Sequence, residues 1–162
     1  MAYGTAWAPF KAAFITLLAA EIDNVSYSSP VTPQDFDGID GSKHIIFWDD
    51  DASATTTIEV FKGLPTWYDE TIEGTLVVQA IGVTTDDTQQ LLDERADATI
   101  YAIRKILQSD PTCGIASTES LELARAEMKG YIPKGGVITD TGIRGARYEI
   151  TIQIEARLKV EN

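Results

Sequence analysis

The sequence predicts an α+β fold, in which a mostly antiparallel, twisted sheet carries a long helix on one face and a second helix at the N-terminus. Two long stretches, 68–83 and 147–160, alternate apolar and polar residues as half-buried strands do. An amphipathic helical pattern lies between these stretches, at 87–108. Strand and helix patterns do not alternate along the whole chain, which disfavours a parallel doubly wound sheet.

The clearest strand is the last one, Arg147–Val160. Apolar residues hold its even positions and polar residues its odd positions, so one face is expected to be buried and the other wet. At the usual rise per residue it spans roughly 45 Å, far longer than the usual strand of about five or six residues. Such a strand is expected to extend beyond the core of its own domain, so that part of it covers a neighbouring subunit. The sequence therefore points to assembly.

Composition narrows the class of protein. A chain of 162 residues with 44% hydrophobic residues predicts one globular domain, 1–162. Its formal net charge of −12 argues against wrapping nucleic acid, which needs a basic surface. The apolar run Ala12–Ala20 is too short to cross a membrane and follows only a lone Lys11, so we expect neither a membrane protein nor a signal peptide. An intracellular, soluble protein is expected.

The first half of the chain predicts one helix and three short strands. Phe10, Phe14 and Leu18 recur at helical spacing within Trp7–Ile22, where Pro9 suits the first turn. The strands are expected at 25–27, 44–48 and 55–61, with a long loop at 28–42 and a turn at Asp49–Asp51.

The second half begins with the strand at 68–83, in which Gly74 and Gly82 suggest a bulge or bend. Asp87 and Gln90 have capping-box spacing, and the helix that they begin is expected to end near Gln108. A loop at 112–120, a strand at 121–132 with a change of face near Arg125, and a glycine-rich loop at 133–145 precede the last strand.

Residues for catalysis or metal binding are scarce. His44 is the only histidine and Cys113 the only cysteine, and a structural role is expected for His44 rather than that of a general base. Asp49, Asp51 and Ser53 match the first ligands of a calcium loop, but Ala54 and Val60 stand where its glycine and its glutamate belong. No phosphate-binding glycine loop occurs. We expect no catalytic residue, no metal, no cofactor and no enzymatic activity.

The order of these segments resembles the tail terminators, or tail-completion proteins, of long flexible-tailed bacteriophages. The N-terminal helix is followed by the proline-bearing stretch SSPVTPQDF and later by a long strand, YDETIEGTLVVQAIG. That strand leads into the helix DDTQQLLDERADATIYAIRKIL, and the chain closes with the alternating strand GARYEITIQIEARL. The resemblance covers most of the chain and rests on the order of elements more than on a fixed motif.

This resemblance implies a structural virion protein at the head-proximal end of a tail, assembled in the host cytoplasm. Such a protein forms a ring, usually hexameric, that caps the tail tube, ends its growth and joins it to the head-side connector or stopper protein. DNA would pass through the ring without specific binding, and an acidic chain suits such a channel. The expected partners are further copies of the chain, the tube protein and the connector.

Two groups of residues are candidates for contacts in such a ring. A closed ring needs two different complementary faces on each subunit. Polar residues on the wet faces of the long strands are expected to contribute to these faces: the charged Glu155, Arg157 and Glu73, and the uncharged Gln79. The loop at 133–145, with Lys134, Asp140 and Arg144, is expected to project into the lumen or onto an adjacent ring.

Other functions remain open at this stage. A tail tube subunit or a head–tail connector is the nearest alternative, and polymerisation into long tubes would distinguish a tube subunit from a terminator. A small-ligand binding domain is a further alternative, and it would be monomeric or dimeric and would retain a ligand. An enzyme that uses acidic residues is the least favoured, because the sequence lacks a base and a metal set.

Overall fold

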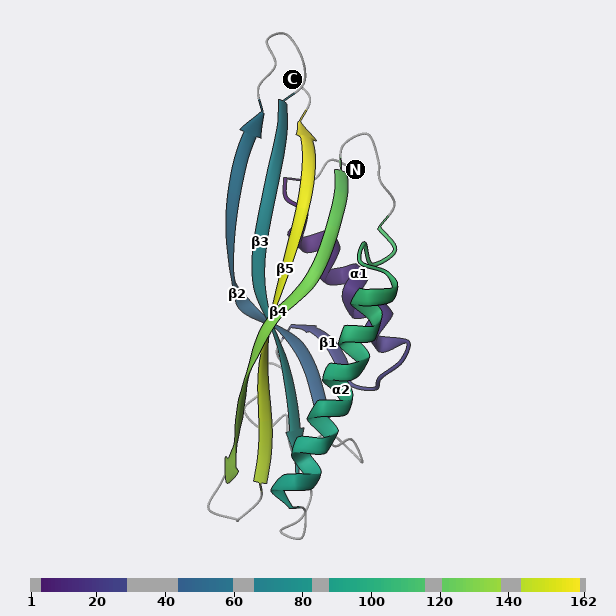
Figure 1. The fold of residues 1–162 in the computed structure, drawn as a ribbon, viewed down its shortest axis with the longest axis vertical. Coiled ribbons are helices and arrows are strands. Elements are labelled where there is room, and N and C mark those ends of the chain that lie inside the picture. The colour runs from purple at the N-terminus through teal and green to yellow at the C-terminus, as the bar shows by residue number, and fades with distance from the viewer. Residues whose placement is uncertain are drawn as a thin grey trace.

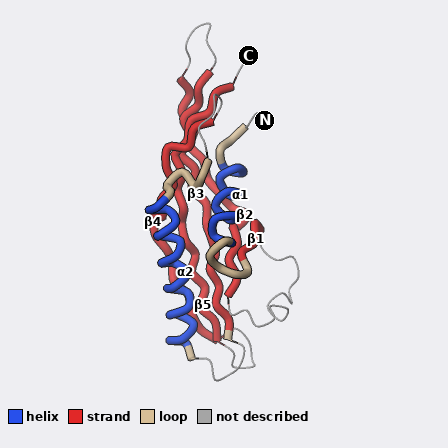
Figure 2. Tube along the Cα trace, turned by 90° about the vertical axis from the view of Figure 1, so that its right-hand side faces the viewer, coloured by secondary structure: helices blue, strands red, loops and turns tan. Residues whose placement is uncertain are grey.

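The protein combines a long, curled sheet with two helices that lie on one side of it (Figures 1 and 2). The computed structural model describes residues 4–28, 44–59, 66–82, 88–115, 121–137 and 144–160. In chain order the elements are α1 (Trp7–Ala19), β1 (Val25–Ser28), β2 (His44–Glu59), β3 (Thr66–Ile81), α2 (Gln89–Ser109), β4 (Leu121–Val137) and β5 (Arg144–Val160).

Within the described residues the sheet has five strands in the order β1-β2-β3-β5-β4. The four long strands pair antiparallel with one another, and the short β1 pairs parallel with β2. The predicted α+β class is therefore confirmed. The two long alternating stretches of the sequence are neighbours in the sheet, because β3 and β5 pair from Thr66↔Val160 to Ile81↔Gly145 without a register shift.

The core lies between the sheet and the helices. β5 contributes its even positions from Tyr148 to Leu158, as the alternation predicts. The helix α2 covers these residues with its own apolar stripe, which includes Leu92, Ile103 and Leu107. The helix α1 buries Phe10 and Phe14 against Trp48 of β2, with ring centroids 5.9 and 5.7 Å from the tryptophan.

The prediction of two short strands separated by a turn at Asp49–Asp51 is wrong. β2 runs without a break from His44 to Glu59, and the three aspartates lie in a register shift between Trp48 and Ala52. They face only one residue of β3, Thr75, so they form a bulge. The Asp50 N–H donates to Asp49 Oδ1 at 2.8 Å, a local bond that supports this irregular backbone.

The predicted loop at 133–145 is much shorter in the structure. β4 extends to Val137 and β5 begins at Arg144, so Lys134 and Arg144 belong to paired strands. The expected change of face near Arg125 is confirmed by a register shift between Leu123 and Arg125. Most of the predicted loop at 28–42 lies outside the described residues.

The two predicted helices are confirmed with small changes at their ends. α1 ends at Ala19, three residues before the predicted end. α2 begins with Thr88 as its N-cap, whose hydroxyl accepts the Leu91 N–H at 3.3 Å. Asp87, the predicted cap, lies outside the described residues.

Candidate functional site: the open face of the sheet

The most distinctive surface is the face of the sheet opposite the helices, which we call the open face. It carries the odd-numbered residues of β5 and β3, because residues that pair across antiparallel strands point to the same side. Glu73 thus lies opposite Gln153, and Gln79 lies opposite Arg147. This face extends along strands of 16 or 17 residues in β2 to β5.

Ion pairs cross the open face from strand to strand. Near one end, Arg157 Nε of β5 donates to Asp69 Oδ1 of β3 at 2.8 Å, and Arg157 Nη2 lies 3.3 Å from Asp69 Oδ2. Arg125 of β4 lies 3.3 Å from the Glu155 carboxylate. These pairs link the three strands laterally, and their side chains stay 41–54% exposed.

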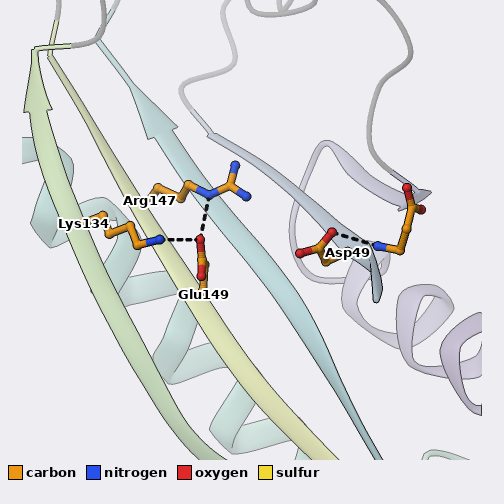
Figure 3. Close-up of polar contacts among 5 residues, drawn as sticks. Asp49, Lys134, Arg147 and Glu149 are labelled. Carbon is orange, nitrogen blue, oxygen red and sulfur yellow. Dashed lines mark hydrogen bonds and ion pairs between the residues drawn. The ribbon is translucent and has the colours of Figure 1, made fainter. Parts of the chain in front are cut away.

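A second group of ion pairs lies toward the other end of β5 (Figure 3). Lys134 Nζ and Arg147 Nε converge on Glu149 Oε1, at 2.8 and 3.3 Å. Hydrogen bonding from Lys134, followed by that from Arg147, lowers the pKa of the Glu149 carboxyl. In the same way, hydrogen bonding from Arg157 lowers the pKa of Asp69.

The structure places all four predicted interface residues on the open face, in different surroundings. Glu155 and Arg157 do not bind one another, since each has a partner on a neighbouring strand of the same chain. Glu73 is exposed. Gln79 is half-buried, and its Oε1 is buried without a hydrogen-bond partner.

The second predicted group is only partly described. Asp140 lies outside the described residues. Lys134 binds Glu149, and Arg144 is an exposed residue whose carbonyl accepts the Gly82 N–H at 2.9 Å. Both side chains border a hollow of about 330 Å³ at this end of the sheet. The other residues that line it are Gln89, Asp93, Pro133, Gly135 and Tyr148.

A small apolar cluster on the open face interrupts its polar surface. Ile45, Phe47 and Val77 are buried there and are separate from the main core. The sequence carries a signal for this cluster, because the unbroken apolar run from 45 to 48 is typical of a strand that is buried on both faces. The partners Asp69, Arg125 and Glu149 were not predicted, because their pairing depends on the strand register.

Cys113, the only cysteine of the sequence, is buried. Burial raises the pKa of the Cys113 thiol to about 12, with a contribution from nearby Asp110, so this thiol is protonated at neutral pH. No group of three or more His, Cys, Asp or Glu side chains that could hold a metal ion occurs within the described ranges. Likewise, none of the described helices has the length and apolar character to cross a membrane.

Similarity to known proteins is found among solved structures. No protein-family model and no curated protein matches the chain. Among solved structures, a chain described as "Virion of native gene transfer agent (GTA) particle" matches with a TM-score of 0.48 and 12% sequence identity. The match covers 94% of this chain and 99% of that chain. A similarity at this level carries no conclusion about function.

Proposed function

We propose that the protein is a structural virion subunit that assembles into a ring and acts as a tail terminator. The ring would cap the tail tube, end its growth and join it to the head-side connector. The observation that carries the proposal is the open face, a polar, ion-paired surface along four long strands. The core of the subunit lies between the helices α1 and α2 and the opposite face of the sheet, so it does not require the open face.

Two further features support the proposal. The sequence resemblance rests on an order of elements: an N-terminal helix, long strands, an amphipathic helix and a closing strand. The fold has its elements in this order. The hollows on the described open face are lined largely by polar and charged side chains, such as Asp69, Glu122 and Arg157. Pockets for small ligands are mostly apolar, so these hollows favour contact with protein or solvent over a retained ligand.

The first test is electron microscopy of the purified protein at several concentrations, with its mass in solution measured alongside. Closed rings that do not stack into tubes are the expected result. Long tubes would instead identify a tail tube subunit. A protein that is monomeric at every concentration, and that stays monomeric when tail tubes are supplied as templates, would overturn the proposal.

We further propose that Glu155 and Arg157 contribute to the contact between neighbouring subunits. Reversing both charges, with Glu155→Arg and Arg157→Glu, is expected to weaken ring formation. Because the reversal also breaks the bonds of these residues to Arg125 and Asp69, the control is Asp69→Asn, which perturbs the Arg157 pair without reversing a charge. If both variants form rings as the wild type does, these residues are not at the interface.

The connection between β4 and β5, which contains Asp140, is proposed to contact the lumen or an adjacent ring. Replacing residues 138–143 with a short glycine–serine linker tests this role, because the paired ends at Val137 and Arg144 are kept. We expect rings to form and tail completion to fail. Normal tail completion would remove this connection from the proposal.

A further inference from the structure

The outer edge of β4 is protected against pairing with another strand. The Ala126 N–H points away from β5 and donates to the Pro111 carbonyl at 2.8 Å. Ala126 lies opposite Ile154, and Pro133 lies opposite Tyr148, an equivalent outward position. Because proline has no N–H, Pro133 offers no donor there. Native edge strands are commonly blunted by such means.

Within the part of the chain that the structure describes, the outer edge of β2 is protected over its first part only. β1 pairs with β2 from Ile46 to Trp48, and the Ile46 N–H donates to the Asn24 carbonyl at 3.1 Å. Beyond Trp48 no described strand pairs with this edge. The chain is also exposed at every position from Asp51 to Thr55, which means on both faces of the strand.

The register shows which backbone groups this part of β2 presents. The Ile46 N–H points away from β3, and Ile46 lies opposite Val78. Ala52 lies opposite Gly74, and Ala54 lies opposite Ile72. Gly74 and Ile72 are separated from Val78 by an even number of residues, and β3 pairs with β5 without a register shift, so all three direct their backbone N–H and C=O groups to the same side, toward β5. Opposed residues in antiparallel strands both point inward or both point outward. Ala52 and Ala54 therefore direct their N–H and C=O groups outward.

Side chains beside this edge make it acidic. Asp51 and Glu73 border an open hollow of about 320 Å³, together with Ser53 and Thr75. Asp49 and Asp50 precede them in the bulge. The stretch from Ala52 to Glu59, ASATTTIE, contains no proline, glycine or basic residue that would discourage strand pairing.

We infer that the β2 edge from Ala52 to Glu59 binds an extended segment of a different, basic protein chain as an added strand. Backbone hydrogen bonds to Ala52 and Ala54 would give affinity, and a lysine or arginine reaching Asp51 and Glu73 would give specificity. A second copy of this chain fits less well, since antiparallel self-pairing would bring the acidic bulge of one copy toward Glu59 of the other. This inference goes beyond ring formation, because the occupant is not another subunit of the ring.

Hydrogen exchange and peptide binding test the inference together. The probe is a short fluorescent peptide that alternates threonine and lysine, and the control peptide alternates threonine and glutamate. In the free protein the Ala52 and Ala54 amides are expected to exchange fast, while those of Ser53 and Thr55 are protected by β3. The lysine peptide should slow exchange at Ala54, and the glutamate peptide should not. Unchanged exchange at Ala54 at saturating lysine peptide, or equal binding of both peptides, would overturn the inference.

Two variants at one position distinguish loss of an edge hydrogen bond from loss of folding. Ala54→Pro removes an outward N–H and leaves the β3 ladder intact, so binding should weaken by about tenfold. Ala54→Thr keeps the N–H and should bind as the wild type does. Should Ala54→Pro fail to fold, Asp51→Asn provides the second route, at a residue outside the predicted ring interface, and should also weaken binding. If folded variants on both routes bind normally, the inference is wrong. Ring formation is measured on the same variants, and rings that persist while peptide binding is lost keep the two proposals distinct.

Discussion

At the scale of single residues, glycine is required at position 74 because the Trp7 ring occupies the space that a side chain would take. The Trp7 ring packs directly on Gly74, and a Cβ added there would collide with Trp7 Cζ2 and Cη2. We expect Gly74→Ala to lower the free energy of unfolding by about 1–3 kcal/mol, because an overpacked site displaces the ring. Denaturant unfolding followed by tryptophan fluorescence measures the change. Gly130→Ala is the control, since a Cβ there meets no atom within 4 Å. Equal effects of both substitutions would contradict this account.

A buried carboxylate holds the start of α1 against the sheet. Glu70 of β3 accepts the Ala6 N–H at 3.0 Å and the Thr5 hydroxyl at 3.1 Å, at a helix N-terminus whose N-cap residue, Ala6, makes no side-chain hydrogen bond. Glu70→Ala is expected to destabilise the protein by about 1–3 kcal/mol, because two donors lose their acceptor. Glu73→Ala, at an exposed position of the same strand, should change stability by less than about 0.5 kcal/mol. Thermal unfolding of both variants checks the difference.

The sequence contains part of the information for these two sites. Alternation along β3 places Glu70 on the inner face with Ile72 and Leu76, and a carboxylate at an inner position needs a partner. The identity of that partner does not follow from the pattern, because Ala6 lies 64 residues away in the chain. Gly74 could be identified as unusual within a strand, but a bulge was the expected reason and the tryptophan ring is the observed one.

At the scale of elements, periodicity predicts long strands better than it predicts their ends. The uninterrupted alternation of β5 was sufficient to predict a strand, and β5 has a partner on both sides. β2 was divided wrongly because three successive aspartates are typical of a turn. An edge strand can hold such residues in a bulge, since one side of its backbone needs no partner.

The ion pairs across the open face predict how its carboxyl groups titrate. Arg157 lowers the pKa of Asp69 mainly by hydrogen bonding, so Arg157→Gln is expected to return that pKa toward its ordinary value of about 3.9. Carbon-detected NMR titration of the side-chain carboxyl measures it. The control, Lys134→Gln, should raise the pKa of Glu149 and leave Asp69 unchanged. An unchanged Asp69 titration in Arg157→Gln would mean that the pair does not persist in solution.

The same pairs determine the sign of a pH effect on stability. A carboxyl group whose pKa is lower in the folded state binds its proton more readily when unfolded. Its stabilising contribution is therefore present above the unfolded pKa and is lost as the pH falls through the lower, folded pKa. For Asp69 and Glu149 this loss is expected below about pH 4, and it should be small because the Asp69 pair is exposed.

At the scale of the whole molecule, most carboxylates of the open face are paired within the chain. Asp69, Glu149 and Glu155 each have a basic partner, whereas exposed Glu73 has no basic partner among the described residues. Further exposed carboxylates without a basic partner among the described residues are Asp50 and Asp51 of β2 and Glu94 of α2. The sequence established the net charge of −12 but could not place it, because placement depends on the register and on the layer that each element occupies.

This distribution predicts how salt affects assembly. In the proposed ring, subunits that each carry a charge of −12 would repel one another, and added salt would screen that repulsion. Because most charges of the open face are paired within the chain, they should contribute few ion pairs between subunits that added salt could weaken. Raising the salt from about 0.01 M to about 0.1 M shortens the Debye length from about 30 Å to about 10 Å, so rings should become severalfold more stable. Analytical ultracentrifugation across this range measures the change.

Glu21→Gln with Glu94→Gln, which removes two negative charges from exposed turn and helical positions, should strengthen assembly at low salt and reduce the dependence on salt. Rings that weaken as salt is added would instead mean that ion pairs between subunits dominate the interface.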